Sequence, residues 1–582
     1  MRIRQKLIVL VAVAAAVSAP LAAAPLRPTH APHAIVVSVH DLASRAGAEI
    51  MQVGGNAIDA AVATGFALAV VHPQAGNIGG GGFLLLRTAQ GETHFIDFRE
   101  KAPAAATANM YLDPQGNVTK DLSVVGYKSV AVPGSVAGLA YAQKKYGKLS
   151  LEKVIAPAIK LAREGFPLAY EDAADLRDKD LANFPDSRRI FQRDGKFYQP
   201  GEILKQPELA HTLERIAKNP DDFYRGALAH EIGAAIQKGG GLITADDLAH
   251  YEVKEREPIR GTYRGYEIIS APPPSSGGVA LVEILNILEG FDLAKLGNRS
   301  AETIHLTSET FRRVFYDRAG FLGDPDFSKI PVPQLIDKKY AAAWRASIDP
   351  NHASVSKDLK RPPFEDLERM AESLSIAVHE SANTTHYSVV DPDGNAVAVT
   401  TTLNDSFGSR VTAEGLGFLL NDEMDDFAAK QGVPNAYGLI QGPANAIGPN
   451  KRPLSTMTPT IVLKNGKLFL VLGSPGGSTI ITTVANVLMG VIDFGLDIQE
   501  AVNAPRFHHQ WLPDQIDVED RLSPDTMNLL RAKGHNLHVG RARRDGRVDY
   551  LWGDAECIMV DLRTGERLGA SDGRNNGKAV GY

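Results

Sequence analysis

Apolar residues recur with helical spacing through much of the chain before residue 360. Residues 46–71 are predicted to form two short helices that break at Gly54-Gly55, and the second is apolar on nearly every side. Asp59 interrupts this second helix, so a buried core helix is expected and not a membrane span of ~20 apolar residues. Further helices are predicted at 149–238, 279–288 and 312–322.

Strand patterns dominate from residue 384 onward. The segment that begins at Thr384 and residues 396–402 flank the turn 392–395, which predicts a hairpin. Asn465-Gly466 divides a second hairpin and favours a type I′ turn. Other predicted elements are strands at 83–87, 94–99 and 417–420, a hairpin over 557–562 and 567–570, and helices at 480–494 and 524–533. Strands of the later segment alone would leave too many open edges, so both parts are expected to share one layered core.

Composition and charge narrow the class of protein. The chain has 582 residues, more than the ~100–200 of one typical domain, and is 44% hydrophobic and 22% charged. A net charge of −6 argues against nucleic acid as a general partner, because no basic excess is available to neutralise phosphates. The single cysteine, Cys557, cannot form an intramolecular disulfide and is interpreted as a small core residue in a buried strand.

Residues 1–24 have the pattern of a cleavable secretory signal peptide. A basic start precedes an apolar run over 7–17 and a series of small residues. Cleavage after Ala24 gives the clearest motif, while cleavage after Ser18 or Ala23, or retention as an anchor, stays open. The apolar run is too short for a stable membrane span. A periplasmic or secreted protein is therefore expected.

Three motifs suggest chemistry that their surroundings do not support. The glycines at 79–82 lack the Lys-Ser/Thr of a phosphate loop. Residues 569–573 match G-x-S-x-G, but no helix follows, as a hydrolase elbow would require. His508-His509 are adjacent and so do not share a face, and no second ligand motif accompanies them. No metal and no cofactor are therefore expected.

Polar residues with catalytic potential gather after position 384. A threonine can act as nucleophile if its own α-amino group is freed as the base, although Thr384 alone is more typical of an ordinary strand start. The return strand of its hairpin would bring Thr402 and Asn404 back beside it. Gly476 and Gly477 could direct two backbone N–H groups at an oxyanion, or form a simple turn. The acidic residues at 422–426 suit either a cation site or a solvated face.

Long motifs in this chain closely resemble the γ-glutamyltranspeptidase family. The resemblance rests on residues 384–391, 420–427, 449–455 and 473–478, with further matches at 77–83, 97–100 and 503–511. It implies an α+β fold of the N-terminal-nucleophile hydrolase type, a four-layer αββα sandwich. It also implies autocatalytic cleavage between Asn383 and Thr384, which would give a large subunit over 25–383 and a small catalytic subunit over 384–582 that form a heterodimer.

The resemblance also implies a role for each matched residue. Thr384 would be the nucleophile, Thr402 would bind it or its amine, and Gly476 and Gly477 would form the oxyanion hole. Arg99, Ser455 and Thr456 would hold the glutamyl α-carboxylate, Asn404, Glu423 and Asp426 would surround the α-ammonium, and Tyr437 would lie in a lid loop. Two positions depart from the usual pattern: Thr456 replaces a serine, and Glu423 stands where the family accepts Glu or Gln.

The implied activity is that of a γ-glutamyltransferase and glutathione hydrolase. Its donors would be glutathione and other γ-glutamyl compounds, and its acceptors water, amino acids or dipeptides. Two alternatives remain at this point: a glutaryl-cephalosporin acylase of the same fold, and an uncleaved, inactive binding protein.

Overall fold

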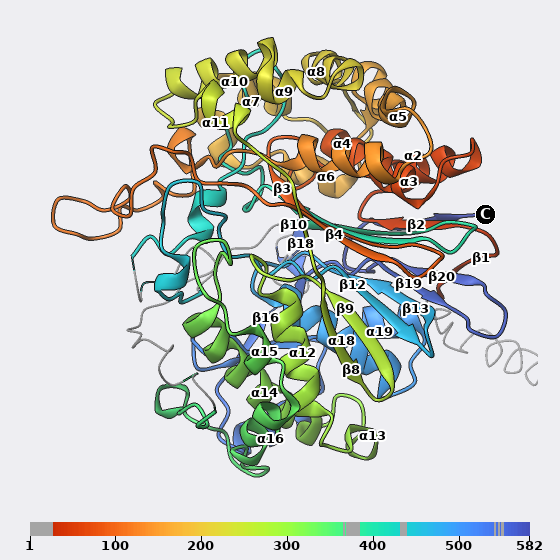
Figure 1. The fold of residues 1–582 in the computed structure, drawn as a ribbon, viewed down its shortest axis with the longest axis vertical. Coiled ribbons are helices and arrows are strands. Elements are labelled where there is room, and N and C mark those ends of the chain that lie inside the picture. Colours follow the sequence, from red (N-terminus) through yellow and green to blue (C-terminus); the bar gives the residue numbers. More distant parts are fainter. Residues whose placement is uncertain are drawn as a thin grey trace, which may run out of the picture.

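Two sheets of seven strands lie face to face at the centre of the molecule, and helices cover the outer face of each (Figure 1). This computed structural model describes residues 27–364, 367, 384–430, 433, 439–540, 543–544, 547–548 and 552–582. The order of layers is helix, sheet, sheet, helix. The predicted four-layer αββα sandwich is therefore confirmed.

The first sheet combines strands from both parts of the chain. Its order is β21 (Lys578–Gly581), β2 (Ile35–Ser38), β10 (Thr384–Val390), β11 (Ala396–Thr402), β3 (Gly81–Arg87), β4 (Thr93–Phe98) and β7 (Lys254–Arg256). All neighbours are antiparallel. Because β2 and β3 flank the β10–β11 hairpin, the two parts of the chain share one core, as predicted.

The second sheet is also antiparallel throughout. Its order is β1 (Thr29–Ala31), β20 (Arg567–Ala570), β19 (Cys557–Val560), β13 (Lys467–Leu472), β12 (Thr460–Lys464), β9 (Tyr266–Ser270) and β8 (Ile259–Tyr263). Asn465 and Gly466, between β12 and β13, have φ values of 52° and 74°, which confirms the predicted type I′ turn. Smaller sheets contain β14 (Phe507–His508), β15 (Ile516–Glu519) and β16 (Leu537–Gly540), then β17 (Arg543–Arg544) with β18 (Arg547–Val548), and β5 (Phe166–Pro167) with β6 (Ile203–Leu204).

One layer of helices packs on the first sheet and on itself. It contains α2 (Asp41–Gln52), α3 (Ala57–Val71), α4 (Ser135–Tyr146), α5 (Leu151–Glu164), α6 (Tyr170–Asp175), α7 (Pro185–Gln192), α8 (Pro207–Lys218), α9 (Asp222–Arg225), α10 (Ala227–Lys238) and α11 (Ala245–Ala249). Every residue of α3 is buried, as its apolar sequence predicts, because it lies between the sheet and α5. Asp59 satisfies the start of α3 by accepting from the backbone N–H of Asn56 at 2.9 Å.

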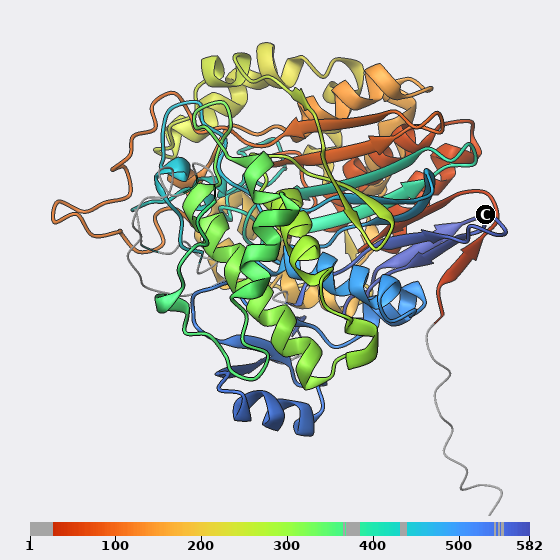
Figure 2. The same cartoon turned by 60° about the horizontal axis from the view of Figure 1, so that its bottom comes forward.

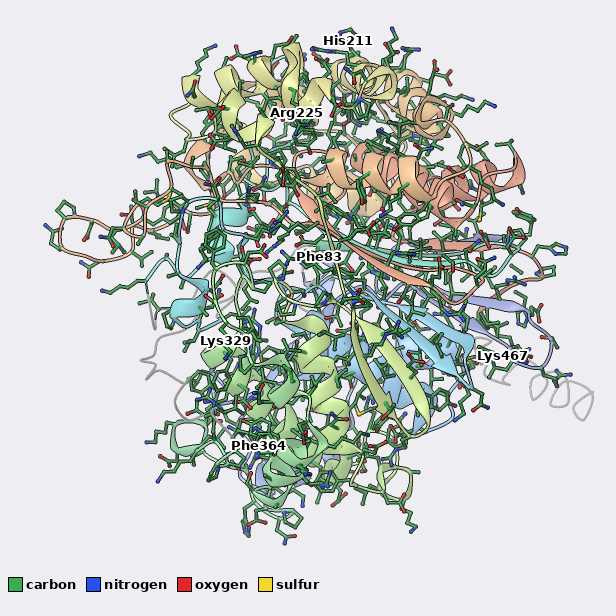
Figure 3. The ribbon with its side chains drawn as sticks, in the orientation of Figure 1. Phe83, His211, Arg225, Lys329, Phe364 and Lys467 are labelled. Carbon is green, nitrogen blue, oxygen red and sulfur yellow. The ribbon has the colours of Figure 1, made fainter. Side chains whose placement is uncertain are left out.

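The other helical layer covers the second sheet (Figure 2). It contains α12 (Gly277–Leu288), α13 (Leu293–Leu296), α14 (Ala301–Phe321), α15 (Val332–Leu335), α16 (Lys338–Ala346), α18 (Thr479–Ile492), α19 (Ile498–Asn503) and α20 (Pro524–Ala532). Between the two sheets lies a separate apolar core that includes Phe83, Ile269 and Ile461. Figure 3 shows Phe83 at the centre of the molecule, whereas His211 and Lys467 lie near its periphery.

Two glycine-containing segments differ from ordinary strands or phosphate loops. Residues 417–420, predicted as a strand, form only an isolated bridge between Thr412 and Leu419. The prediction is wrong because Gly415 and Gly417 have φ values of 72° and 79°, which turn the chain back on itself. The glycines at 79–82 instead allow close packing, since a Cβ on Gly80 would lie 2.0 Å from the carbonyl oxygen of Thr402.

Among the described helices, none combines the length and the apolar character that crossing a membrane requires.

Candidate active site

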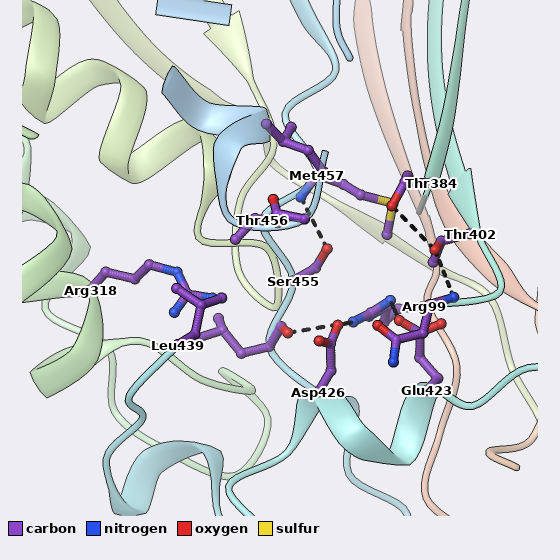
Figure 4. A pocket seen from close by; sticks show the side chains of 14 residues that line it. Arg99, Arg318, Thr384, Thr402, Glu423, Asp426, Leu439, Ser455, Thr456 and Met457 are labelled. Carbon is purple, nitrogen blue, oxygen red and sulfur yellow. Dashed lines mark hydrogen bonds and ion pairs between the residues drawn. The ribbon is translucent and has the colours of Figure 1, made fainter. Parts of the chain in front are cut away.

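A pocket with about 310 Å³ of empty space opens where the β10–β11 hairpin meets the loops above the second sheet (Figure 4). Its lining is Arg99, Arg318, Thr384, Thr402, Asn404, Glu423, Asp426, Leu439, Leu454, Ser455, Thr456, Met457, Gly477 and Ile480. Nearly all the residues predicted from the sequence thus come together, and Gly476 is the neighbour of Gly477. Asn383 and Tyr437 lie outside the described residues.

Thr384 is the first residue of β10 and is almost completely buried at this pocket. Register pairs it with Thr402 on β11, and the two hydroxyl oxygens lie 3.3 Å apart. Thr402 also accepts the backbone N–H of Asn404 at 2.8 Å. Asn404 has a φ of 81°, a left-handed conformation that an asparagine tolerates better than most residues. The hairpin therefore brings a threonine hydroxyl, a second hydroxyl and an amide to one point, as the sequence predicts.

Arg99 lies just after β4 and is completely buried among carboxylates. Its Nη1 donates to Glu423 and its Nη2 donates to Asp426, while Glu100 lies 3.4 Å from Nη1. Burial opposes the charge on Arg99, but the carboxylates outweigh it and raise its pKa. The guanidinium is therefore charged, and two carboxylates currently occupy its fork.

Two of the carboxyl groups around Arg99, those of Glu100 and Glu423, have raised pKa values. Burial raises the pKa of Glu100 to about 7, although Arg99 works against this shift. Burial also raises the pKa of Glu423 well above its usual value, with Glu100 and Asp426 adding repulsion. The Arg99 guanidinium is thus shared by the carboxyl groups of Glu100, Glu423 and Asp426. A guest with both a carboxylate and an ammonium group can exchange partners with them without leaving a buried charge unpaired.

Ser455 and Thr456, the hydroxyl residues on the far side of the pocket from the hairpin, already make local hydrogen bonds. Ser455 Oγ accepts the backbone N–H of Met457 at 3.1 Å, so its own hydrogen can point into the pocket. Thr456 instead donates to the carbonyl of Gly477 at 2.6 Å. Its hydroxyl hydrogen therefore holds the glycine segment in place and does not point at a ligand, which differs from the donor role expected from the sequence.

We call residues 473–477 the glycine loop; it connects β13 to the start of α18. Gly476 and Gly477 have φ values of 130° and 53°. A Cβ on Gly476 would lie 2.5 Å from Thr479 Oγ1, so glycine is required there for space as well as for conformation. The loop precedes the N-terminus of α18, where the helix dipole favours negative charge. The position of the glycine loop is therefore suitable for stabilising an oxyanion.

Arg318, on α14, is a pocket residue that the sequence analysis missed. It is buried, which lowers its pKa to about 10, and its Nε donates to Ser276 Oγ at 2.9 Å. The sequence predicted the helix but gave no reason to single out this arginine. Its separation from Arg99 along the chain hides the fact that both guanidinium groups line one pocket.

Two facing antiparallel sheets between helical layers, with a threonine opening a central strand at the pocket, define an N-terminal-nucleophile hydrolase. A family model described as gamma-glutamyltranspeptidase matches residues 43–582. The chain belongs to the γ-glutamyltranspeptidase family.

Individual relatives support this placement. The chain is 50% identical over 569 residues to a glutathione hydrolase proenzyme of Pseudomonas sp. (strain A14), covering 96% of each chain. It is 50% identical over 552 residues to the glutathione hydrolase proenzyme of Escherichia coli (strain K12), covering 94% of this chain and 91% of the relative. A cephalosporin acylase from Bacillus halodurans has a similar structure, with a TM-score of 0.82, 30% identity and coverage of 97% and 98%.

Proposed function

We propose that this protein is a γ-glutamyltransferase and glutathione hydrolase whose nucleophile is Thr384. The observation that supports this most strongly is the charge pattern beside Thr384. Arg99 suits an α-carboxylate, while Glu423 and Asp426 suit an α-ammonium. A γ-glutamyl group carries both charges at one end and a reactive carbonyl at the other.

Maturation is proposed to occur at the peptide bond between Asn383 and Thr384. The Thr384 hydroxyl attacks the Asn383 carbonyl, the C–N bond breaks, and the acyl group moves from nitrogen to oxygen. Water then hydrolyses the resulting ester and frees the α-amino group of Thr384. The products would be a large subunit over 25–383 and a small subunit over 384–582, held together by the shared first sheet.

Turnover then uses the freed amine as the general base. With an ordinary pKa near ~8, this amine accepts the Thr384 hydroxyl proton as Oγ1 attacks the γ-carbonyl of the donor. The N–H groups of Gly476 and Gly477 would stabilise the oxyanion, each worth roughly 3–4 kcal/mol. The proton passes to the departing amine, and a γ-glutamyl ester remains on Thr384. Water, or the amino group of an amino acid or dipeptide, attacks this ester and regenerates the hydroxyl.

The remaining pocket residues are proposed to hold the donor. Arg99 and Ser455 would bind the α-carboxylate, Thr402 would bind the nucleophile or its amine, and Asn404, Glu423 and Asp426 would bind the α-ammonium. Thr456 would act through Gly477. Tyr437 is proposed to lie in a lid that limits access of water and acceptors.

The site of action is proposed to be the periplasm or the exterior of the cell. The support is the basic, apolar and small-residue pattern of residues 1–24, which is typical of a signal peptide. Sequencing the N-terminus of the exported protein tests this, and a chain that retains residue 1 would contradict cleavage.

An acylase of glutaryl-cephalosporin is the second candidate, because a cephalosporin acylase has a similar structure. Turnover of a γ-glutamyl anilide and a glutaryl anilide separates the two, since only the first carries an α-ammonium. A preference for the glutaryl donor rejects the proposal. A denaturing gel completes the test: two bands, the smaller beginning at Thr384, are expected, and one uncut, inactive chain would indicate a binding protein.

A further inference from the structure

A buried histidine, His386, lies between the two sheets just behind Thr384. Alternate residues of β10 face opposite sides: Tyr387 and Val389 join the core beneath the helices, whereas Val390 joins the core between the sheets. His386 is two positions from Thr384, so both share the face that looks toward the second sheet. It is completely buried.

The ring of His386 contacts the base of the glycine loop. A Cβ added to Gly473 would lie 2.3 Å from Cε1 and 2.4 Å from Nδ1 of His386. No other residue could therefore stand at Gly473 without moving the ring or the backbone. Gly473 directly follows β13 and begins the loop that carries Gly476 and Gly477. The ring therefore separates the strand of the nucleophile from the loop of the proposed oxyanion hole.

Hydrogen bonds fix both the orientation and the tautomer of this ring. Nδ1 lies 2.8 Å from Thr400 Oγ1, and Nε2 lies 3.1 Å from Ser388 Oγ. Ser388 gives its only hydroxyl hydrogen to the carbonyl of Glu556, at 2.8 Å, so it must accept from Nε2. Nε2 therefore carries the hydrogen, and Nδ1 accepts from Thr400.

The ring is also neutral. Burial lowers the pKa of His386 to about 3. At neutral pH the histidine thus has no charge to contribute, and it does not line the pocket among the residues that contact a donor. Its contribution is geometric: a rigid, flat side chain held at both nitrogens.

We propose that His386 is a positioning residue, which sets the distance between Thr384 and the glycine loop. This inference rests on the proposed roles of Thr384, Gly476 and Gly477. Displacing the oxyanion donors by about 1 Å costs on the order of 10²-fold in rate, while the groups that hold the donor's charged end are unaffected. Loss of this positioning should therefore lower kcat and leave KM unchanged.

The first test replaces His386 by Phe, which keeps a flat ring and removes both hydrogen bonds. The expected result is a fall in kcat of about 10²-fold with γ-glutamyl anilide, at unchanged KM, per mole of cleaved small subunit. Thr400→Val is the matched control, because it removes the hydrogen-bond partner of Nδ1 and leaves the ring unchanged. It should also lower kcat, but by a smaller factor. An unchanged kcat in His386→Phe, or a loss seen only in KM, overturns the proposal.

The second test probes the contact itself through a double-mutant cycle. Gly473→Ala should lower kcat because its methyl group pushes the loop away from the ring. The penalty should shrink when His386→Ala is also present, since alanine lacks both Cε1 and Nδ1, the two ring atoms nearest to the methyl group. Additive effects of the two substitutions would show that the ring does not set the loop.

A variant that stays uncut is also informative. Its thermal midpoint is compared with that of the uncut Thr384→Ala precursor. Equal midpoints support the proposal, because attack on Asn383 then fails in a normally folded chain. A clearly lower midpoint contradicts it and assigns the ring to core packing alone. Absence of γ-glutamyl turnover in the unaltered protein would reject the proposed function, which keeps the two failures distinct.

Discussion

Replacing Asp426 by Asn should separate recognition of the two charges on a γ-glutamyl donor. Asp426 accepts a hydrogen bond from Arg99 Nη2, and its side chain is only 14% exposed. Asparagine keeps the shape and removes the negative charge. A glutaryl donor has the same chain and carboxylate as a γ-glutamyl donor and differs only in lacking the α-ammonium. The substitution should therefore slow the reaction of the γ-glutamyl donor and leave the reaction of the glutaryl donor intact.

The expected magnitude follows from the burial of the site. A hydrogen bond to a charged group contributes about 1.5–3 kcal/mol, and solvent screens it little at this depth. With about 1.4 kcal/mol per factor of ten, kcat/KM for the γ-glutamyl donor should fall by roughly 10–150-fold. Arg99 keeps Glu423 as a partner, so the pocket should remain folded. The glutaryl donor should react equally well or better, because its carboxylate meets one competitor fewer at Arg99.

Initial rates with γ-glutamyl and glutaryl nitroanilides measure this directly. The ratio of the two kcat/KM values is the readout, since it cancels any loss of active protein. Glu267→Gln, at an exposed ion pair on the far strands β8 and β9, is the control and should leave the ratio unchanged. Equal losses for both donors in Asp426→Asn would refute an ammonium site at Asp426.

Three further outcomes follow from the structure. Thr384→Ala should leave one uncut band on a denaturing gel and no turnover, and a cleaved Thr384→Ala protein would exclude this nucleophile. Thr402→Val removes a hydroxyl 3.3 Å from Thr384 Oγ1; kcat should fall by about tenfold, the value of one hydrogen bond of ~1.4 kcal/mol, and an unchanged kcat contradicts the contact. Burial opposes ionisation of Glu309, but Arg312 and Arg313 outweigh it and lower its pKa from 4.5 to about 2. Its stabilising effect is therefore present above pH 4.5 and lost as the pH falls toward 2. Glu309→Gln should thus lower the thermal midpoint at pH 7, with a difference from the unaltered protein that closes across this window; a constant difference refutes the ion-pair origin.

Local sequence patterns predicted the secondary-structure elements and the pairing of Thr384 with Thr402 at the site. The two hairpins were predictable because alternation and turn residues act over a few positions, as the left-handed Asn465 and Gly466 show. The predicted hairpin also placed Thr402 opposite Thr384, and the observed strand register confirms this pairing. Motif resemblance then supplied the fold and the remaining candidates, of which Arg99, Glu423 and others line one pocket.

One prediction was wrong because the local hydrophobic pattern does not indicate the path that the chain takes. Residues 417–420 are apolar enough for a strand, yet they turn around glycines and pair only at Leu419. A hydrophobic pattern records that a residue is buried, but it does not record which partner buries it.

By itself, then, the sequence determined the elements, the family resemblance and the choice of Thr384 as the proposed nucleophile, because each of these rests on motifs of residues close together in the chain. Only the tertiary structure decided that Arg99 is shared between Glu423 and Asp426, that Thr456 holds Gly477, and that Arg318 joins the pocket. It also placed His386 against Gly473. These contacts join segments far apart in sequence, and such contacts are fixed by how layers pack, which no local periodicity encodes.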